Sequence, residues 1–299
     1  MATILHPLFA LLLAPMILGI ITKVKAIFAG RQGPPIVQPY YDIIKFIQKG
    51  SVFSNTTTWL FGLGPSLGLA VMPICLMFLP LGNLDPAISF QGDFVFVIYL
   101  LALARFFTVL AAMDTGSAFE GMGSSREMGF SALAEPALLF ALATLARKTG
   151  SLSMSGLISG ISPDLWQNNS ATLVLVLIGL FLVFLAENSR IPVDDPTTHL
   201  ELTMIHEVMV LDHSGVDFGI IEYAASLKMW ILGIIIAAIA VPIRTGYFII
   251  DTSAMLAALV LLAILVGIIE STMSRLRLLQ IPHLLVGACL LSVVGFLIH

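Results

Sequence analysis

Acidic residues gather in one stretch of this sequence, and carboxylates that lie close together in an apolar chain can exchange protons. The stretch reads "AENSRIPVDDPTTHLELTMIHEVMVLDHSG" and runs from Ala186 to Gly215. Positions 187–222 hold eight of the eighteen carboxylates, although only 11% of all residues are charged. Charged groups are costly in so apolar a chain, so this concentration of acids is a hypothesis of function.

Three further ionisable side chains lie inside or at the end of apolar runs. Arg105 lies in "YLLALARFFTVL", Glu135 in "SALAEPALLF", and Glu187 closes another run. A charge inside a membrane is costly, so each is a functional hypothesis. For Arg105 a structural ion pair is the favoured interpretation. For Glu135 and Glu187 we favour a carboxyl group with an exchangeable proton over a structural pair.

The histidines and cysteines do not predict a metal site. His199, His206 and His213 are spaced by seven, whereas zinc ligands on a helix are normally four residues apart. A metal remains an alternative to solvated or pH-responsive histidines. Cys75 and Cys289 lie far apart, so we expect no iron–sulfur cluster in this chain. Nucleotide-binding and hydrolase motifs are also absent, and we expect no catalytic chemistry in the chain itself.

The elements that must position these residues are membrane helices. Hydrophobic residues make up 58% of the chain and its mean hydropathy is +1.02, which excludes an ordinary soluble protein. A spanning helix needs about 20 apolar residues. We predict an all-α polytopic membrane protein, one domain over residues 1–299, with eight spans at 4–22, 59–81, 94–113, 128–147, 171–188, 226–244, 253–270 and 281–298.

The basic residues predict the orientation of the spans. The loops after the odd-numbered spans, with their edges, hold ten Lys and Arg residues, and the opposite side holds three. Positive residues favour the cytoplasm, so both termini are expected outside it. The acidic stretch between spans five and six then faces the cytoplasm.

Two shorter helices are expected in the loops on that side. In "GPPIVQPYYDIIKFIQKG", Ile36, Tyr40, Ile43, Ile44 and Ile47 share one helical stripe, from which Asp42, Lys45 and Lys49 are excluded. This pattern predicts an amphipathic helix at the membrane interface or under a partner, with a plain connecting helix as the alternative. In "DDPTTHLEL", Asp195 is a suitable cap and Pro196 suits a first turn. A half-buried acidic helix is therefore expected to continue to Met209.

Several motifs resemble the NuoH-type subunit, also called subunit 1 of respiratory complex I. That family has the pattern A-E, R-x-P-F-D, E-A-E-x-E-L and E-Y-S-G. The matching positions here are Ala186, Glu187, Arg190, Pro192, Asp194, Glu201 and Leu202, with residues 212–215 in place of E-Y-S-G. The family also has an Arg nine residues before a Glu, as Arg126 stands before Glu135. The resemblance covers nearly the whole chain.

The departures from complex I are similar to the hydrogenase branch of the family. Thr197 and His199 replace residues that are usually Glu in complex I. The uninterrupted "PVDDPTTHLELTMIHEVM" resembles the membrane anchor subunits of formate hydrogenlyase and hydrogenase-4, which belong to energy-converting [NiFe] hydrogenases.

The resemblance implies a membrane anchor and coupling subunit in a prokaryotic cytoplasmic membrane. Its implied partners are hydrogenase-like large and small hydrophilic subunits, antiporter-like membrane subunits and the lipid bilayer, with no nucleic acid. The [NiFe] and iron–sulfur centres would belong to those partners. The implied proton-path carboxylates are Glu135, Glu187, Asp194 and Glu201; the implied docking or cavity residues are Arg126, Arg190, Asp195, Glu207 and Asp212.

Two alternatives remain open at this point. The same platform can serve a complex that reduces quinone or has lost hydrogen chemistry. A stand-alone ion or solute transporter is a different class, and it would show internal repeat symmetry, which the sequence does not show.

Overall fold

The computed structural model describes residues 5–195 and 203–298. Eight described helices are long and apolar enough to cross a membrane, which confirms the predicted class and the number of spans. These helices are α1 (Leu5–Phe28), α3 (Trp59–Leu76), α4 (Asp93–Asp114), α5 (Ala118–Thr149), α7 (Pro163–Glu187), α8 (Gly215–Ala240), α9 (Phe248–Thr272) and α10 (Ile281–Leu297). The shorter elements are α2 (Gln38–Ile47), α6 (Met154–Ser159) and the 3₁₀ turns η2 (Glu207–Val210) and η3 (Leu278–Gln280).

Two helices begin about ten residues earlier than hydropathy predicts. Helix α5 starts at Ala118 rather than 128, and α8 starts at Gly215 rather than 226. Both added segments carry acidic residues, such as Glu120 and Glu222, which lower the hydropathy of the window. The helices continue because these acids lie against other parts of the protein, with Glu120 almost fully buried.

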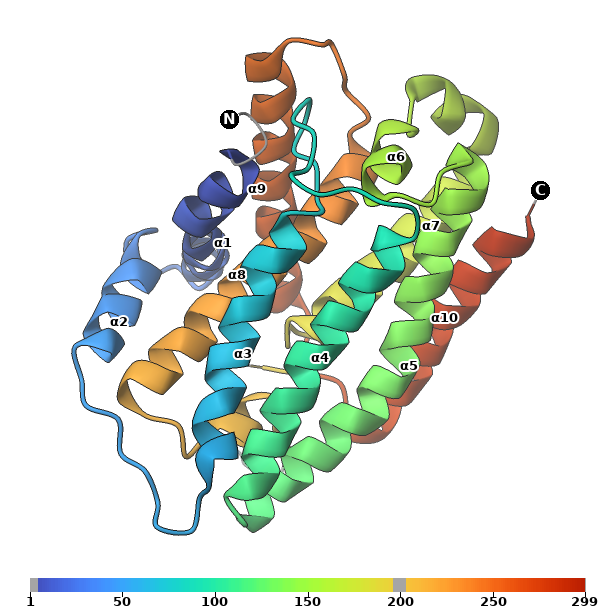
Figure 1. Ribbon diagram of the computed structural model, residues 1–299. Helices are drawn as coiled ribbons and strands as arrows, with labels where there is room; N and C mark the ends of the chain where they lie inside the picture. The colour runs from blue at the N-terminus through green and yellow to red at the C-terminus, as the bar shows by residue number, and fades with distance from the viewer. Residues whose placement is uncertain (1–4, 196–202, 299) are drawn as a thin grey trace.

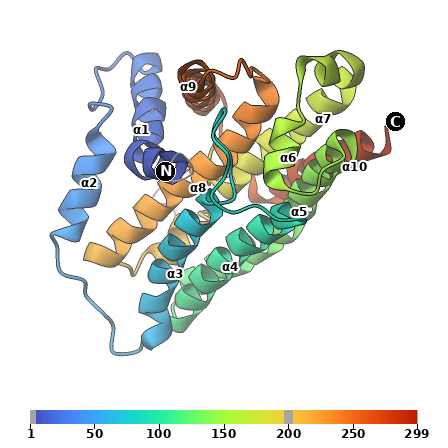
Figure 2. The ribbon, with the colours of Figure 1, turned by 45° about the horizontal axis from the view of Figure 1, so that its top comes forward.

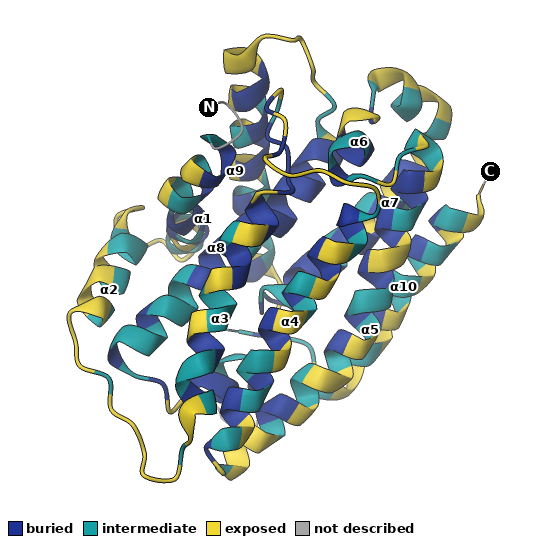
Figure 3. Ribbon diagram, viewed as in Figure 1, coloured by how far each residue is buried: buried dark blue, intermediate teal, exposed yellow. Residues whose placement is uncertain are grey.

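Helix α8 runs through the centre of the bundle (Figures 1 and 2). It packs against α1, α2, α3, α7 and α9, while α3 lies along α4, and α5 along α10. Buried residues concentrate along α8 and on the inner faces of the other helices, and exposed residues lie on the outer faces (Figure 3). The outer faces are apolar, with exposed Leu12, Phe106 and Leu261 among them, as a lipid-facing surface requires.

Small residues allow close approach between the helices. A Cβ atom placed on Gly267 of α9 would lie 2.8 Å from Cβ of Val24 in α1. On Gly64 of α3 it would lie 2.7 Å from Cβ of Ala111 in α4. Glycine at such positions is typical of packed membrane helices, because it brings backbones close enough for extensive van der Waals contact.

Helix α2 confirms the predicted helix in the first loop. It lies beside the start of α8, where Phe46 packs edge-on against Phe218 with ring centroids 4.9 Å apart. Asp42 lies on this inner side, whereas Ile44 and Ile47 of the predicted stripe are exposed.

The connection from α7 to α8 is not the α-helix that the sequence predicts, at least in its described part. Residues 203–206 form turns and bends, and a 3₁₀ turn follows at Glu207–Val210. Thr197, His199 and Glu201 lie outside the described residues. The segment is irregular because its backbone N–H groups at Ile205 and His206 donate to the side chain of Asp194 instead of to helical carbonyls.

Candidate functional site: a charged cavity in the bundle

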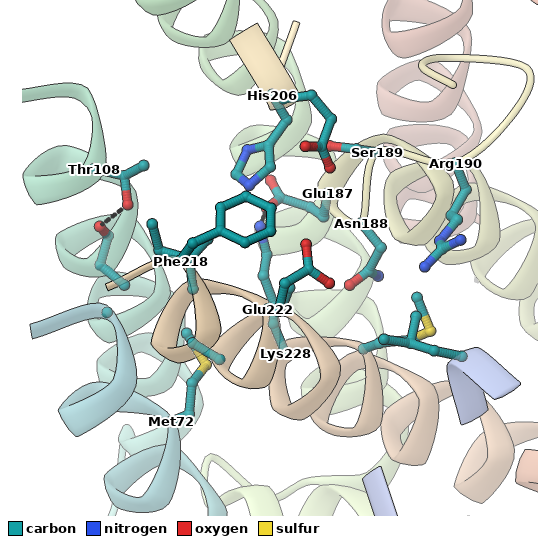
Figure 4. A pocket seen from close by; sticks show the side chains of 18 of the residues that line it. Met72, Thr108, Glu187, Asn188, Ser189, Arg190, His206, Phe218, Glu222 and Lys228 are labelled. Atoms are coloured by element: carbon teal, nitrogen blue, oxygen red, sulfur yellow. Dashed lines mark hydrogen bonds and ion pairs between the residues drawn. The ribbon is translucent and has the colours of Figure 1, made fainter. Parts of the chain in front are cut away.

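A cavity of about 560 Å³ lies between helices α1, α2, α3, α4, α5, α7, α8 and α9. The segment between α7 and α8 (residues 188–214), which we call the acidic connection, forms another part of its wall. Apolar side chains such as Ile21, Met72 and Phe218 form part of its wall. Ten charged side chains also line it: Lys25, Asp42, Arg105, Glu127, Glu187, Arg190, Glu207, Glu222, Lys228 and Glu270. Figure 4 shows Glu187, Arg190, Glu222 and Lys228 pointing into the same space.

Arg105 is the centre of an ion-pair cluster at one side of this cavity. Its guanidinium contacts Glu187 of α7, lies 2.5 Å from Glu135 Oε1, and places Nε 3.3 Å from Glu127 Oε1 on α5. The Arg105 side chain is only 7% exposed. A second cation, Lys228 of α8, lies 2.8 Å from Glu187 Oε2. The cluster therefore ties four helices together, in agreement with the favoured interpretation of Arg105.

A second ion-pair group lies across the cavity. Glu270 of α9 is fully buried at its side chain and lies 2.8 Å from Lys25 of α1 and 3.4 Å from Arg190. Arg190 follows the end of α7, so this group joins three separated segments of the chain. Two cations face one carboxylate here, and the local charge is positive.

Glu207 and Glu222 line the cavity without an ion pair to any described residue. Burial, and then the neighbouring carboxylate of Glu222, raises the pKa of Glu207 to about 7. Arg190 opposes this shift without cancelling it. Glu207 therefore changes its protonation state near neutral pH, as a proton-exchanging group requires.

His206 projects from the acidic connection into the cavity, close to Glu187 (Figure 4). Burial, and then the charge of Lys228, lowers the pKa of His206 to about 4. The imidazole is therefore neutral at neutral pH and can accept or donate a hydrogen bond without adding charge.

Asp194 stabilises the acidic connection through hydrogen bonds and an ion pair, and it does not line the large cavity. Its Oδ2 accepts hydrogen bonds of 3.1 Å from the N–H groups of both Ile205 and His206. Its Oδ1 lies 2.9 Å from Nη2 of Arg275 in the α9–α10 connection. Arg126 of α5 adds another fastening, because its Nη1 donates to the carbonyl of Met204 at 2.8 Å.

A small second cavity of about 20 Å³ lies between α5, α7 and the connection. Asp194, Glu127 and Glu187 are among its lining residues. This volume accommodates about one water molecule. Glu127 and Glu187 line both cavities, so they stand between the large cavity and Asp194.

The sequence-predicted site residues fall into three groups in the structure. Glu187, Arg190 and Glu207 line the large cavity. Glu135 and Arg126 line neither cavity, although Glu135 joins the Arg105 cluster from a partly exposed position. Residues 195 and 212 belong to the connection: the N–H of Asp195 donates to Asp194, and the N–H of Asp212 donates to Glu120 at 3.1 Å.

The residue assignments from the sequence leave out six of the ten charged side chains of the cavity: Lys25, Asp42, Glu127, Glu222, Lys228 and Glu270. Glu127 follows Arg126 directly and precedes the span predicted at 128–147, so the hydropathy pattern predicts that it lies in a loop. Lys228 and Glu270 lie at the edges of predicted spans, where charges are ordinary. The ion-pair partners of Glu127, Lys228 and Glu270 come from other helices, so no local pattern in the sequence indicates these pairs.

No metal centre is evident in the part of the chain that the structure describes. No group of three His, Cys, Asp or Glu side chains within residues 5–195 and 203–298 is placed to hold an ion. His206 lies in the cavity, whereas His213 stacks on Phe61 with ring centroids 3.9 Å apart.

Eight membrane-length helices around a cavity lined by ionisable side chains define a multi-pass membrane protein. The chain belongs to the NADH dehydrogenase family, the NuoH-type family that its motifs resemble, because that family's model matches residues 1–299.

Two relatives are similar to the chain in sequence, and one solved structure shares its fold. It is 32% identical to hydrogenase-4 component C of Escherichia coli over 91% of this chain and 87% of the relative. It is 29% identical to formate hydrogenlyase subunit 4 of the same organism over 94% of each chain. A chain of the archaeal membrane-bound sulfane sulfur reductase has the same fold, with a TM-score of 0.82, 22% identity, and coverage of 99% of this chain and 97% of that one. The protein is therefore a complex-I-like membrane subunit.

Proposed function

We propose that this chain is the membrane anchor and coupling subunit of a membrane-bound [NiFe] hydrogenase or formate hydrogenlyase-type complex. It docks the hydrophilic arm and links electron transfer in that arm to proton movement. The observation that carries the proposal is the cavity of ionisable side chains, whose wall includes residues of the acidic connection. The names of the two bacterial relatives support the hydrogenase assignment.

The coupling role rests on how the acidic connection is held. Residues 203–205 are bound by three side chains: Arg275 contacts Thr203, Arg126 contacts Met204, and Asp194 contacts Ile205. The next two residues, His206 and Glu207, line the cavity. A partner docked on this connection would therefore move ionisable groups of the cavity. In this proposal the [NiFe] and iron–sulfur centres belong to the docked subunits, and antiporter-like subunits contact the bundle within the membrane.

A quinone-reducing complex is the second candidate, and the size of the cavity favours it. About 560 Å³ with a partly apolar wall lies within the range of small-molecule sites. A stand-alone transporter is disfavoured, because the relatives that cover nearly the whole chain are named as components of larger assemblies.

Purification in a mild detergent, with mass-spectrometric identification of partners, tests the assembly. The expected result is a stoichiometric large soluble subunit with two Cys-x-x-Cys pairs, which supply the thiolates that nickel and iron require. A homologous subunit without these pairs would favour the quinone alternative. Recovery of the chain alone would contradict both proposals.

Neutralising one carboxylate tests the coupling. Glu187→Gln keeps the size of the side chain but removes the charge that pairs with Arg105 and Lys228. In the purified complex reconstituted in vesicles, we expect electron transfer to persist while coupled proton movement falls. Asp164→Asn, at an exposed position in the first turn of α7, is the matched control. Unchanged proton movement in Glu187→Gln would contradict the coupling role.

A further inference from the structure

The Arg105 cluster has more carboxylates than cations. Arg105 and Lys228 face Glu127, Glu135 and Glu187. If all five groups were ionised, the cluster would carry one excess negative charge. An uncompensated charge is costly at a buried site within a membrane, so one bound proton is the expected compensation.

The neighbours of the cluster do not supply the missing positive charge. His206 faces it from the acidic connection and is neutral at neutral pH, because burial lowers its pKa to about 4. Arg275 is paired with Asp194 at 2.9 Å. Lys25 and Arg190 are paired with Glu270 across the cavity, and the positive charge left over in that group faces Glu222 and Glu207.

Contact geometry distinguishes the three carboxylates. Glu187 contacts both cations, and Glu135 lies 2.5 Å from Nη1 of Arg105. Glu127 is 3.3 Å from Nε, and the Nε–H group forms no hydrogen bond within the described residues. Ionised carboxylates are stabilised by short charge-assisted hydrogen bonds. Glu127, which has the weakest such contact and a side chain only 14% exposed, is therefore the group that binds a proton at least cost.

Glu127 is also reachable from two sides. It lines the large cavity and the small cavity, and Asp194 lines only the small one. The groups that face Glu127 come from every helix around it: Arg105 from α4, Glu187 from α7 and Lys228 from α8.

We propose that Glu127 holds the single exchangeable proton of the Arg105 cluster and is the position at which protons pass between the two cavities. Glu135 and Glu187 remain ionised and fix the cations, while Glu127 alternates between carboxyl and carboxylate. The proposal rests on the proposed coupling function and identifies the residue that carries its proton. The proposal assigns the proton-transfer step to Glu127 instead of Glu135, because Glu135 lines neither cavity.

Infrared difference spectroscopy of the intact purified complex tests which carboxyl is protonated. The spectra are recorded in a Glu207→Gln background, because Glu207 would otherwise contribute its own carboxyl band near neutral pH. In this background the protein without further changes is expected to show the C=O stretching band of a buried protonated carboxyl group. This band should be lost in Glu127→Gln, shifted in Glu127→Asp and unchanged in Asp164→Asn. A band that persists in Glu127→Gln overturns the proposal. Loss of the band in Glu187→Gln is expected too, because two cations then face two carboxylates.

A second variant tests the charge balance without altering Glu127. Lys228→Met raises the excess negative charge from one to two, so the carboxyl band should persist to higher pH than in the wild type. An unchanged titration of the band overturns the charge-balance argument. This measurement remains decisive if Glu127→Gln fails to assemble.

Coupled proton uptake in vesicles tests the passage between cavities. A positioned proton-transfer group contributes about 10²-fold or more, so Glu127→Gln should reduce proton uptake by about 10²-fold while electron transfer persists. If the wild-type complex couples proton uptake to electron transfer and Glu127→Gln takes up protons at an undiminished rate, the proposed role of Glu127 is overturned. The proposed function of the chain then remains intact. Absence of coupling in the wild-type complex contradicts the proposed function, and the infrared measurement then decides the protonation of Glu127 separately.

Discussion

At the scale of single residues, charge pairing explains how an apolar bundle tolerates ten charged side chains around one cavity. Arg105 and Glu187 are each less than a tenth exposed, and both have partners on other helices. Glu207 and Glu222 face the cavity and have no such partner among residues 5–195 and 203–298. Paired groups thus hold the helices in place, and unpaired groups are available to titrate.

Removal of Arg105 should damage the cluster more than removal of one carboxylate. Arg105→Met leaves Glu127, Glu135 and Glu187 without their shared cation. Breaking a buried pair by removing one partner costs about 3–5 kcal/mol, so a clear drop in the detergent unfolding midpoint is expected. Arg105→Met combined with Glu187→Gln should recover part of the loss; equal midpoints for the single and double variants would contradict the ion-pair role.

The pH dependence of stability should contain a contribution from Glu207. Its pKa is raised in the folded protein from 4.5 to about 7, so the folded state binds more protons than the unfolded state between these values. Its contribution to stability therefore falls as pH rises from about 4.5 through about 7. Unfolding midpoints measured from pH 5 to 8 should decline less in Glu207→Gln than in the wild type.

His206 and His213 act in the opposite direction. Burial lowers the pKa of each from 6.5 to about 4, so their contribution rises as pH increases from about 4 to 6.5. The difference between the wild type and Glu207→Gln isolates Glu207, because both proteins contain the histidines. Identical pH profiles would contradict the raised pKa of Glu207.

At the scale of elements, the acidic connection depends on side-chain acceptors rather than on regular secondary structure. Asp194 accepts from two backbone N–H groups, and Glu120 accepts from the N–H of Asp212. Such a segment can rearrange by exchanging a few hydrogen bonds, whereas an α-helix would have to unwind.

Asp194→Ala should loosen this connection selectively. The N–H groups of Ile205 and His206 lose their acceptor, so their hydrogen exchange should accelerate, as measured by mass spectrometry. Asp212→Asn is the control, because the exposed side chain of Asp212 accepts none of these bonds. Unchanged protection of both amides in Asp194→Ala would contradict the fastening role.

The contact between α1 and α9 should tolerate no additional methyl group. Gly267→Ala places a Cβ 2.8 Å from Cβ of Val24, so the helices must separate. Overpacking of this kind costs about 1–3 kcal/mol and should lower the unfolding midpoint. Gly62→Ala is the matched control, since no neighbouring atom lies within 4 Å of its added Cβ. Equal midpoints in the two variants would contradict the close packing.

At the scale of the whole molecule, the fold holds its termini at one end and the connections after α2 and α4 at the other. Both termini lie in the upper part of Figure 1, and the connections after α2 and α4 lie at the bottom. The distribution of Lys and Arg predicts that the lower end faces the cytoplasm.

Reporter fusions test this orientation. Alkaline phosphatase, which is active only outside the cytoplasm, should be active when fused after Ile298 and inactive when fused in the loop at Ser54. The reverse pattern would overturn the orientation, and with it docking at the acidic connection.

The sequence by itself determined the membrane class, the eight spans and the family, because hydropathy and motif spacing are local properties of the chain. It also indicated Arg105, Glu187, Arg190 and Glu207 as candidate residues. Only the tertiary structure decided which charges meet. Glu127, Lys228 and Glu270 acquire their partners from helices distant in sequence, and Asp42 faces the cavity because α2 lies against α8. Pairing depends on through-space distance and burial, which the spacing along one chain segment does not encode.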